Sequence, residues 1–127
     1  MIELPSKNKY KMSTLEFTTF EERLQQAQKF KERFPNNVPL VIQRDERSTL
    51  PPDLHNKLFL APLTLTASQF IVLIRRQTKL PKTHAMVLFA ESKRLVTSDI
   101  TISELYDKFS AQDGFLYLLC TDHPAFG

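Results

Sequence analysis

The chain contains one cysteine and three histidines, residue types that can act as nucleophile and base or bind a metal ion. Cys120 could act as a nucleophile if a distant histidine activated it. It lies, however, in the apolar run Phe115–Cys120, where a buried and unreactive thiol is the more common state. None of the histidines stands at metal-ligand spacing from another or from Cys120; they are His55, His84 and His123. The sequence therefore contains no pattern typical of a catalytic or zinc site.

Composition argues against several other classes of protein. The chain has 127 residues, is 42% hydrophobic and carries a net charge of +3, which indicates one folded domain rather than a disordered chain. It contains only two glycines, Gly114 and Gly127, whereas phosphate-binding loops need several. No apolar run is long enough to cross a bilayer, and the first residues do not resemble a secretory signal. We therefore expect a cytoplasmic protein without a cofactor.

Charge is distributed unevenly along the chain. Residues 61–98 carry six basic residues and one acidic residue, whereas residues 99–127 carry one basic and five acidic residues. A basic surface could bind nucleic acid, anionic lipid or an acidic partner, although a solvated helix face is the simpler interpretation. Tryptophan is absent and the phenylalanines follow core periods, so the sequence does not indicate an RNA-stacking surface. We expect no nucleic-acid partner.

The N-terminal part predicts a basic arm followed by two helices. Residues 1–11 contain three lysines and no apolar period, which predicts a flexible arm. Ser13–Glu16 and Thr19–Glu22 each match a capping box, the pattern that opens a helix. The apolar spacing that follows predicts an amphipathic helix over about residues 20–33, ended by Pro35.

The rest of the chain predicts four strands and two helices. Apolar and β-branched runs predict strands at Val38–Ile42, Lys57–Ala61, Ala85–Ala90 and Phe115–Cys120, and capping boxes at Thr66–Gln69 and Thr101–Glu104 open the helices. Alternation along the second strand places residues 58 and 60 on one face and 59 and 61 on the other, so both faces are apolar. The last run is unbroken, as in a central strand covered on both faces.

The resulting order, α-α-β-β-α-β-α-β, predicts an α+β fold. Without its first two helices it is the order of a ubiquitin-like β-grasp, in which a main helix covers a four-stranded mixed sheet. We therefore predict one such domain over residues 12–127, with two additional N-terminal helices.

Short motifs with a common pattern occur in order along the chain. They are Phe20–Arg23, Phe34–Ile42, Lys57–Pro62, Leu65–Phe70, Ile74–Arg75, Leu105–Tyr106, Asp113–Tyr117 and Phe126–Gly127. Each motif alone is weak, but together they resemble the ubiquitin-like autophagy modifiers of the GABARAP family. The resemblance covers about residues 11–127.

This resemblance implies a protein modifier rather than an enzyme. In that family a terminal glycine carboxylate is activated as an adenylate and passed as a thioester through activating and conjugating enzymes. It is then joined to the amine of phosphatidylethanolamine on autophagosomal membranes, and a cysteine protease trims any residues beyond the glycine. Gly127 would be the conjugation site, because a residue without a Cβ can enter a narrow active-site channel. The two acyl chains of the lipid would supply the membrane anchor.

The resemblance also implies a groove for aromatic-x-x-aliphatic peptides, such as those of cargo receptors. A peptide would add as a strand along Lys57–Pro62, which we expect to be an edge strand, since Pro62 lacks an N–H. The family's aromatic pocket corresponds to Gln26, Phe30, Pro39, Leu58, Leu60 and Phe115, and its aliphatic pocket to Phe59, Ala61, Pro62, Leu65, Phe70 and Leu73. We expect Phe70 and Leu73 to serve mainly in core packing.

Three positions depart from the family pattern. Relatives often have a base at Leu58, an acid at Gln26 and an arginine at Gln77. Their absence puts in doubt the preference for acidic residues around the peptide motif, unless Lys57 and Arg44 compensate. Two alternatives stay open: a ubiquitin-like peptide-binding domain that is not conjugated and, more distantly, a cysteine-dependent enzyme.

Overall fold

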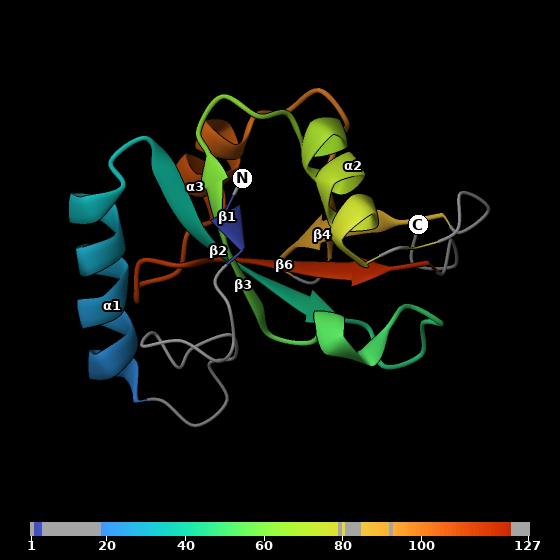
Figure 1. The fold of residues 1–127 in the computed structure, drawn as a ribbon, viewed down its shortest axis with the longest axis horizontal. Helices are drawn as coiled ribbons and strands as arrows, with labels where there is room; N and C mark the ends of the chain where they lie inside the picture. Colours follow the sequence, from blue (N-terminus) through green and yellow to red (C-terminus); the bar gives the residue numbers. More distant parts are fainter. Residues whose placement is uncertain (1, 4–18, 79, 81–84, 92, 123–127) are drawn as a thin grey trace.

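One mixed sheet with helices on both faces organises the molecule (Figure 1). The computed structural model describes residues 2–3, 19–78, 80, 85–91 and 93–122. The strands are β1 (Ile2–Glu3), β2 (Asn37–Arg44), β3 (Lys57–Pro62), β4 (Val87–Ala90), β5 (Arg94–Leu95) and β6 (Leu116–Thr121). The helices are α1 (Phe20–Arg33), α2 (Ala67–Thr78), α3 (Ile102–Phe109) and the short 3₁₀ helix η1 (Pro52–Leu54).

The sheet has the topology of a ubiquitin-like β-grasp. Its strand order is β1-β3-β2-β6-β4-β5. The neighbours β2 and β6 are parallel, while β2–β3 and β4–β6 are antiparallel. The predicted fold is thereby confirmed, but the described sheet has six strands rather than four. The two additional strands, β1 and β5, are two residues long each, too short to show any alternation in the sequence.

Predicted capping boxes open the described helices α1, α2 and α3. The backbone N–H groups of Glu22 and Glu104 donate to the hydroxyls of Thr19 and Thr101, at 3.1 Å in both cases. At the start of α2, the Gln69 N–H donates to the Thr66 hydroxyl at 3.3 Å. The helix predicted over residues 20–33 is confirmed as α1. The other predicted capping box, Ser13–Glu16, lies outside the described residues, as does the basic arm apart from Ile2–Glu3, which forms β1.

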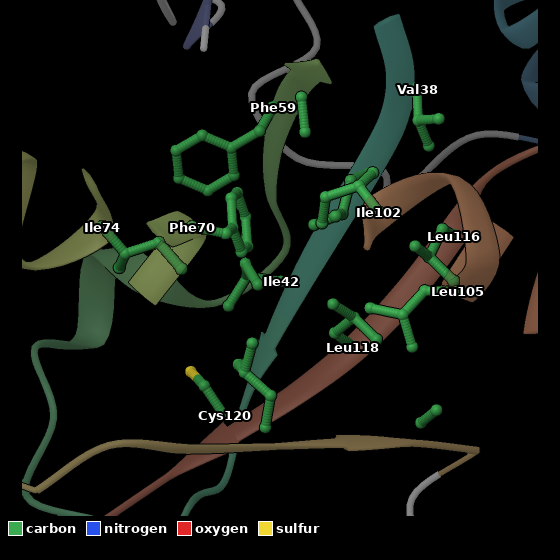
Figure 2. Packing of buried hydrophobic residues seen from close by; sticks show 14 of the residues in the cluster. Val38, Ile42, Phe59, Phe70, Ile74, Ile102, Leu105, Leu116, Leu118 and Cys120 are labelled. Atoms are coloured by element: carbon green, nitrogen blue, oxygen red, sulfur yellow. The ribbon is translucent and has the colours of Figure 1, made fainter. Parts of the chain in front are cut away.

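Two separate apolar clusters cover the two faces of the sheet. The larger one, here called the α2-face cluster, includes side chains from α2, α3 and the sheet, ten of which are labelled in Figure 2: Val38, Ile42, Phe59, Phe70, Ile74, Ile102, Leu105, Leu116, Leu118 and Cys120. The smaller one, the α1-face cluster, consists of Ala27, Phe30, Val41, Leu58, Leu60 and Phe115. Each face of the sheet therefore has its own core.

Strand β6 lies in the middle of the sheet, between β2 and β4, as its unbroken apolar run predicts. The cover on its two faces is unequal. Leu116, Leu118 and Cys120 are buried in the α2-face cluster, whereas Tyr117 and Leu119 are only half-buried. The α1 side therefore covers less of this strand than the α2 side does.

Candidate functional site

Strand β3 contributes to both clusters. Leu58 and Leu60 belong to the α1-face cluster, while Phe59 and Ala61 belong to the α2-face cluster. All four side chains are fully buried. The predicted alternation is confirmed, and it places the two sets of candidate peptide-binding residues on opposite faces of the sheet.

Four of the six residues predicted for an aromatic pocket come together in the α1-face cluster: Phe30, Leu58, Leu60 and Phe115. The rings of Phe30 and Phe115 meet edge to face, with their centroids 6.5 Å apart. Pro39 is buried and lies opposite Leu60 in the β2–β3 register. Because Phe30, Leu60 and Phe115 are buried against one another, a peptide side chain could enter here only if these side chains moved apart.

Gln26 lies on α1, next to Ala27 of the α1-face cluster. Its amide oxygen Oε1 is buried and has no hydrogen-bond partner among the described residues. A buried acceptor without a donor destabilises the folded state, typically by about 1–3 kcal/mol. Within the described part of the chain, α1 therefore carries a buried acceptor that no donor satisfies.

A polar network fastens α1 to the sheet. The Arg23 guanidinium donates to Asp113 Oδ2 at 3.0 Å, and the Tyr117 hydroxyl donates to the same oxygen at 2.5 Å. The other carboxylate oxygen of Asp113 accepts from the Phe115 N–H at 3.0 Å. Burial, together with this carboxylate, raises the pKa of Tyr117 well above its usual value. We did not predict this network, although the Asp113–Gly114 turn motif marks its position in the sequence.

Gly114 allows α1 to approach closely. Its φ is +90°, a conformation that side chains with a Cβ rarely adopt. A Cβ at this position would also lie 2.8 Å from the Cβ of Ala27 on α1. The contact between α1 and the β6 end of the sheet therefore depends on a residue without a side chain.

The residues predicted for an aliphatic pocket are spread between the core and its margin. The rings of Phe59 and Phe70 pack edge to face, with their centroids 5.6 Å apart (Figure 2). Leu65 is half-buried against the α2-face cluster, and Pro62 is half-buried at the end of β3. Phe70 is a core residue as predicted, but the prediction was wrong for Leu73, which is only half-buried. On α2 the buried positions are instead Ala67, Phe70 and Ile74.

The prediction that Lys57–Pro62 forms an edge strand was wrong. Strand β3 pairs with β2 along one side and with β1 along the other. The register places Ile2 opposite Leu60 and Glu3 opposite Phe59. This pairing joins segments that are far apart in the chain, so no local sequence pattern predicts it.

The structure shows where the residues at the positions that depart from the family pattern, and the basic residues near them, are placed. Arg44, one of the two basic residues that could compensate for the missing charges, donates to the carbonyl oxygens of Leu50 at 2.7 Å and Ser48 at 2.8 Å. These two hydrogen bonds tie Arg44 to the loop after β2. Lys57 is half-buried at the start of β3, and Gln77 is exposed on α2.

Cys120 is buried in the α2-face cluster. Burial raises the pKa of its thiol to about 12, so the thiol is protonated at neutral pH and is a poor nucleophile. Within the described part of the chain, no three His, Cys, Asp or Glu side chains gather closely enough to hold a metal ion.

Two cavities in the described part of the molecule lie away from the predicted groove. One, of about 430 Å³, lies beside α3 and has Arg94, Leu95, Val96 and Phe109 in its wall. The other, of about 370 Å³, shares Phe109 with it and reaches Tyr117. Gly127, the predicted conjugation site, lies outside the described residues.

Comparison with known proteins identifies the family of this chain. Residues 22–127 match the family model described as "Autophagy protein Atg8 ubiquitin like". The chain belongs to the Atg8 family. It is 37% identical to human microtubule-associated protein 1 light chain 3 gamma over 75% of this chain and 65% of that relative. It is 32% identical to autophagy-related protein 8d of Arabidopsis thaliana, over 84% of this chain and 88% of that relative.

Solved structures of Atg8 proteins have the same fold. The crystal structure of Trypanosoma brucei ATG8 superposes with a TM-score of 0.76 at 30% identity, covering 91% of this chain and 94% of that one. Plasmodium falciparum Atg8, solved with a Plasmodium falciparum Atg3 peptide, superposes with a TM-score of 0.73 at 24% identity, covering 84% and 92%.

These matches establish the Atg8 family as a whole rather than its GABARAP branch, which was the narrower prediction. As a ubiquitin-like protein of this family, the chain is not an enzyme. None of its described helices is long and apolar enough to cross a membrane.

Proposed function

We propose that this Atg8-family chain is a modifier that is joined through the Gly127 carboxylate to phosphatidylethanolamine on autophagosomal membranes. The observation that carries the proposal is the family match, which extends from residue 22 to Gly127. The chain would supply the acyl group. Activating and conjugating enzymes would supply ATP-dependent activation and the thiol of the thioester, and a processing cysteine protease would trim and release the modifier.

The described residues fit a passive role in this chemistry. The cysteine of the chain is buried and protonated, so the chain brings no thiolate of its own. Its described helices cannot cross a bilayer. Membrane attachment would then come from the two acyl chains of the conjugated lipid, each buried CH₂ contributing about 0.8 kcal/mol.

We further propose that the modifier acts as an adaptor for aromatic-x-x-aliphatic peptides of cargo receptors, which would bind along β3. Support comes from the apolar side chains of β3, which contribute to the clusters on both faces of the sheet, and from the aromatic residues that pack beneath α1. Further support comes from Plasmodium falciparum Atg8, which was solved in complex with a Plasmodium falciparum Atg3 peptide. The residues that would contact the peptide are Gln26, Phe30, Pro39, Lys57, Leu58, Phe59, Leu60, Ala61, Pro62, Leu65, Phe70, Leu73 and Phe115.

Reconstituted lipidation tests the conjugation directly. The full chain, the activating and conjugating enzymes, ATP and phosphatidylethanolamine vesicles are incubated, and attachment is read as flotation with the vesicles. We expect the unchanged chain to float and a variant without Gly127 to stay in the soluble fraction, because it lacks the acyl group in the required position. Cys120→Ala is the matched control and should float normally.

A variant that lacks Gly127 and still becomes lipidated would contradict the proposal. An unchanged chain that binds peptide but is not lipidated would instead support the non-conjugated alternative.

A further inference from the structure

The outer edge of β3 is occupied by a segment from the start of the same chain. In Figure 1, β1 lies against β3. The two strands are antiparallel, with Ile2 opposite Leu60 and Glu3 opposite Phe59. These two positions are the middle of β3 (Lys57–Pro62), and the inner edge of the same strand is paired with β2.

This arrangement conflicts with the binding of a peptide as an added strand. A strand that joins a sheet uses the outward N–H and C=O groups of the edge strand, and each edge accepts one partner. While β1 is paired with β3, the outward backbone N–H and C=O groups in the middle of β3 are not available to a peptide. Binding of β1 and binding of a peptide strand along β3 are therefore mutually exclusive.

We propose that the Ile2–Glu3 segment is an internal competitor, which covers the peptide-docking edge of β3 until a peptide displaces it. This inference rests on the docking function proposed above. It assigns to the N-terminal segment a role in setting peptide affinity, in addition to any role in protecting the sheet edge.

The pairing lengths indicate that β1 is displaceable. Strands β1 and β3 share two residue pairs, whereas β2 and β3 share six, from Asn37 opposite Pro62 to Ile42 opposite Lys57. A two-residue strand has few contacts to lose, so it can leave the sheet while β3 stays paired with β2.

Competition within one chain is nonetheless effective. A segment tethered to its own binding site returns to it at an effective concentration on the order of millimolar, whatever the protein concentration. The apparent dissociation constant of a peptide then rises in inverse proportion to the fraction of molecules whose edge is open. If about one molecule in ten is open, removal of the competitor strengthens binding by about tenfold.

The test compares three forms of the full chain. The double variant Ile2→Pro/Glu3→Pro removes two backbone N–H groups and so prevents β1 from pairing. The matched control Ile2→Val/Glu3→Gln keeps both N–H groups and β propensity at Ile2. Affinity for a synthetic peptide with one Trp-Glu-Glu-Leu sequence is measured by calorimetry, and amide hydrogen exchange is measured over residues 57–62 of the free proteins.

We expect the proline variant to bind the peptide about three- to tenfold more tightly than the unchanged chain, and the control to bind equally. Exchange should become faster at the outward amides of Phe59 or Leu60 in the proline variant alone. Equal affinity of the proline variant and the unchanged chain would overturn the competition. If none of the three forms bound the peptide while the proline variant still showed faster exchange, the docking function itself would fail, and the competition with it.

Discussion

The two faces of the sheet differ in how much they bury. Among the described residues, the α2-face cluster contains seventeen buried residues from α2, α3, η1, the loops and the sheet, whereas the α1-face cluster contains six. Helix α1 contributes only Ala27 and Phe30 to its cluster. The two clusters therefore contribute unequally to stability. The large cluster supplies most of the stability, and the small one can be altered, by mutation or by a ligand, at a lower cost in free energy.

The largest effect is expected in the α2-face cluster. Phe70→Ala removes a fully buried ring that packs against Phe59, and we expect the free energy of unfolding to fall by about 3–5 kcal/mol. Chemical denaturation measures this loss. The exposed neighbour Val72 on the same helix is the control, and Val72→Ala should change the stability by less than about 0.5 kcal/mol. Similar losses for the two variants would contradict the placement of the main core.

The same substitution in the α1-face cluster should cost less. Phe30 is 5% exposed and belongs to the smaller cluster, so we expect Phe30→Ala to cost about 3 kcal/mol, at the lower end of the usual range for this substitution. Phe20→Ala, at an exposed position of the same helix, serves as the control and should have little effect. A loss for Phe30→Ala equal to or greater than that for Phe70→Ala would remove the proposed difference between the faces.

The smallest effect has the opposite sign. Gln26→Leu replaces a buried acceptor that has no partner among the described residues by an apolar group, so we expect a gain of about 1 kcal/mol in the free energy of unfolding. Gln25→Leu changes the adjacent exposed residue and should leave stability unchanged. A loss of stability in Gln26→Leu would show that the amide makes a favourable interaction in solution.

Local sequence patterns predicted most of the fold. The capping boxes at Thr19, Thr66 and Thr101 are short-range devices, and all three open helices at the expected residues. The alternation in β3 and the unbroken run in β6 likewise follow from which faces of a strand are covered. Burial of Cys120 could be predicted from the same run.

Contacts between distant segments could not be predicted in this way. The pairing of Ile2 with Leu60 joins residues far apart in the sequence, and a two-residue strand shows no period. The loop contacts of Arg44, and the lack of a donor for the Gln26 oxygen among the described residues, depend on how the folded chain places polar atoms. Leu73 follows the helical apolar pattern, but it lies at the margin of the buried stripe of α2.

The central claim is that β3 and the cluster under α1 form the peptide-docking site. Nuclear magnetic resonance titration of the full chain with the Trp-Glu-Glu-Leu peptide tests it most directly. We predict that the largest amide shift changes occur along Leu58–Ala61 and at Phe30, with displacement of Ile2–Glu3. Shift changes confined to the cavity beside α3, at Leu95, Val96 and Phe109, with β3 unaffected, would contradict it.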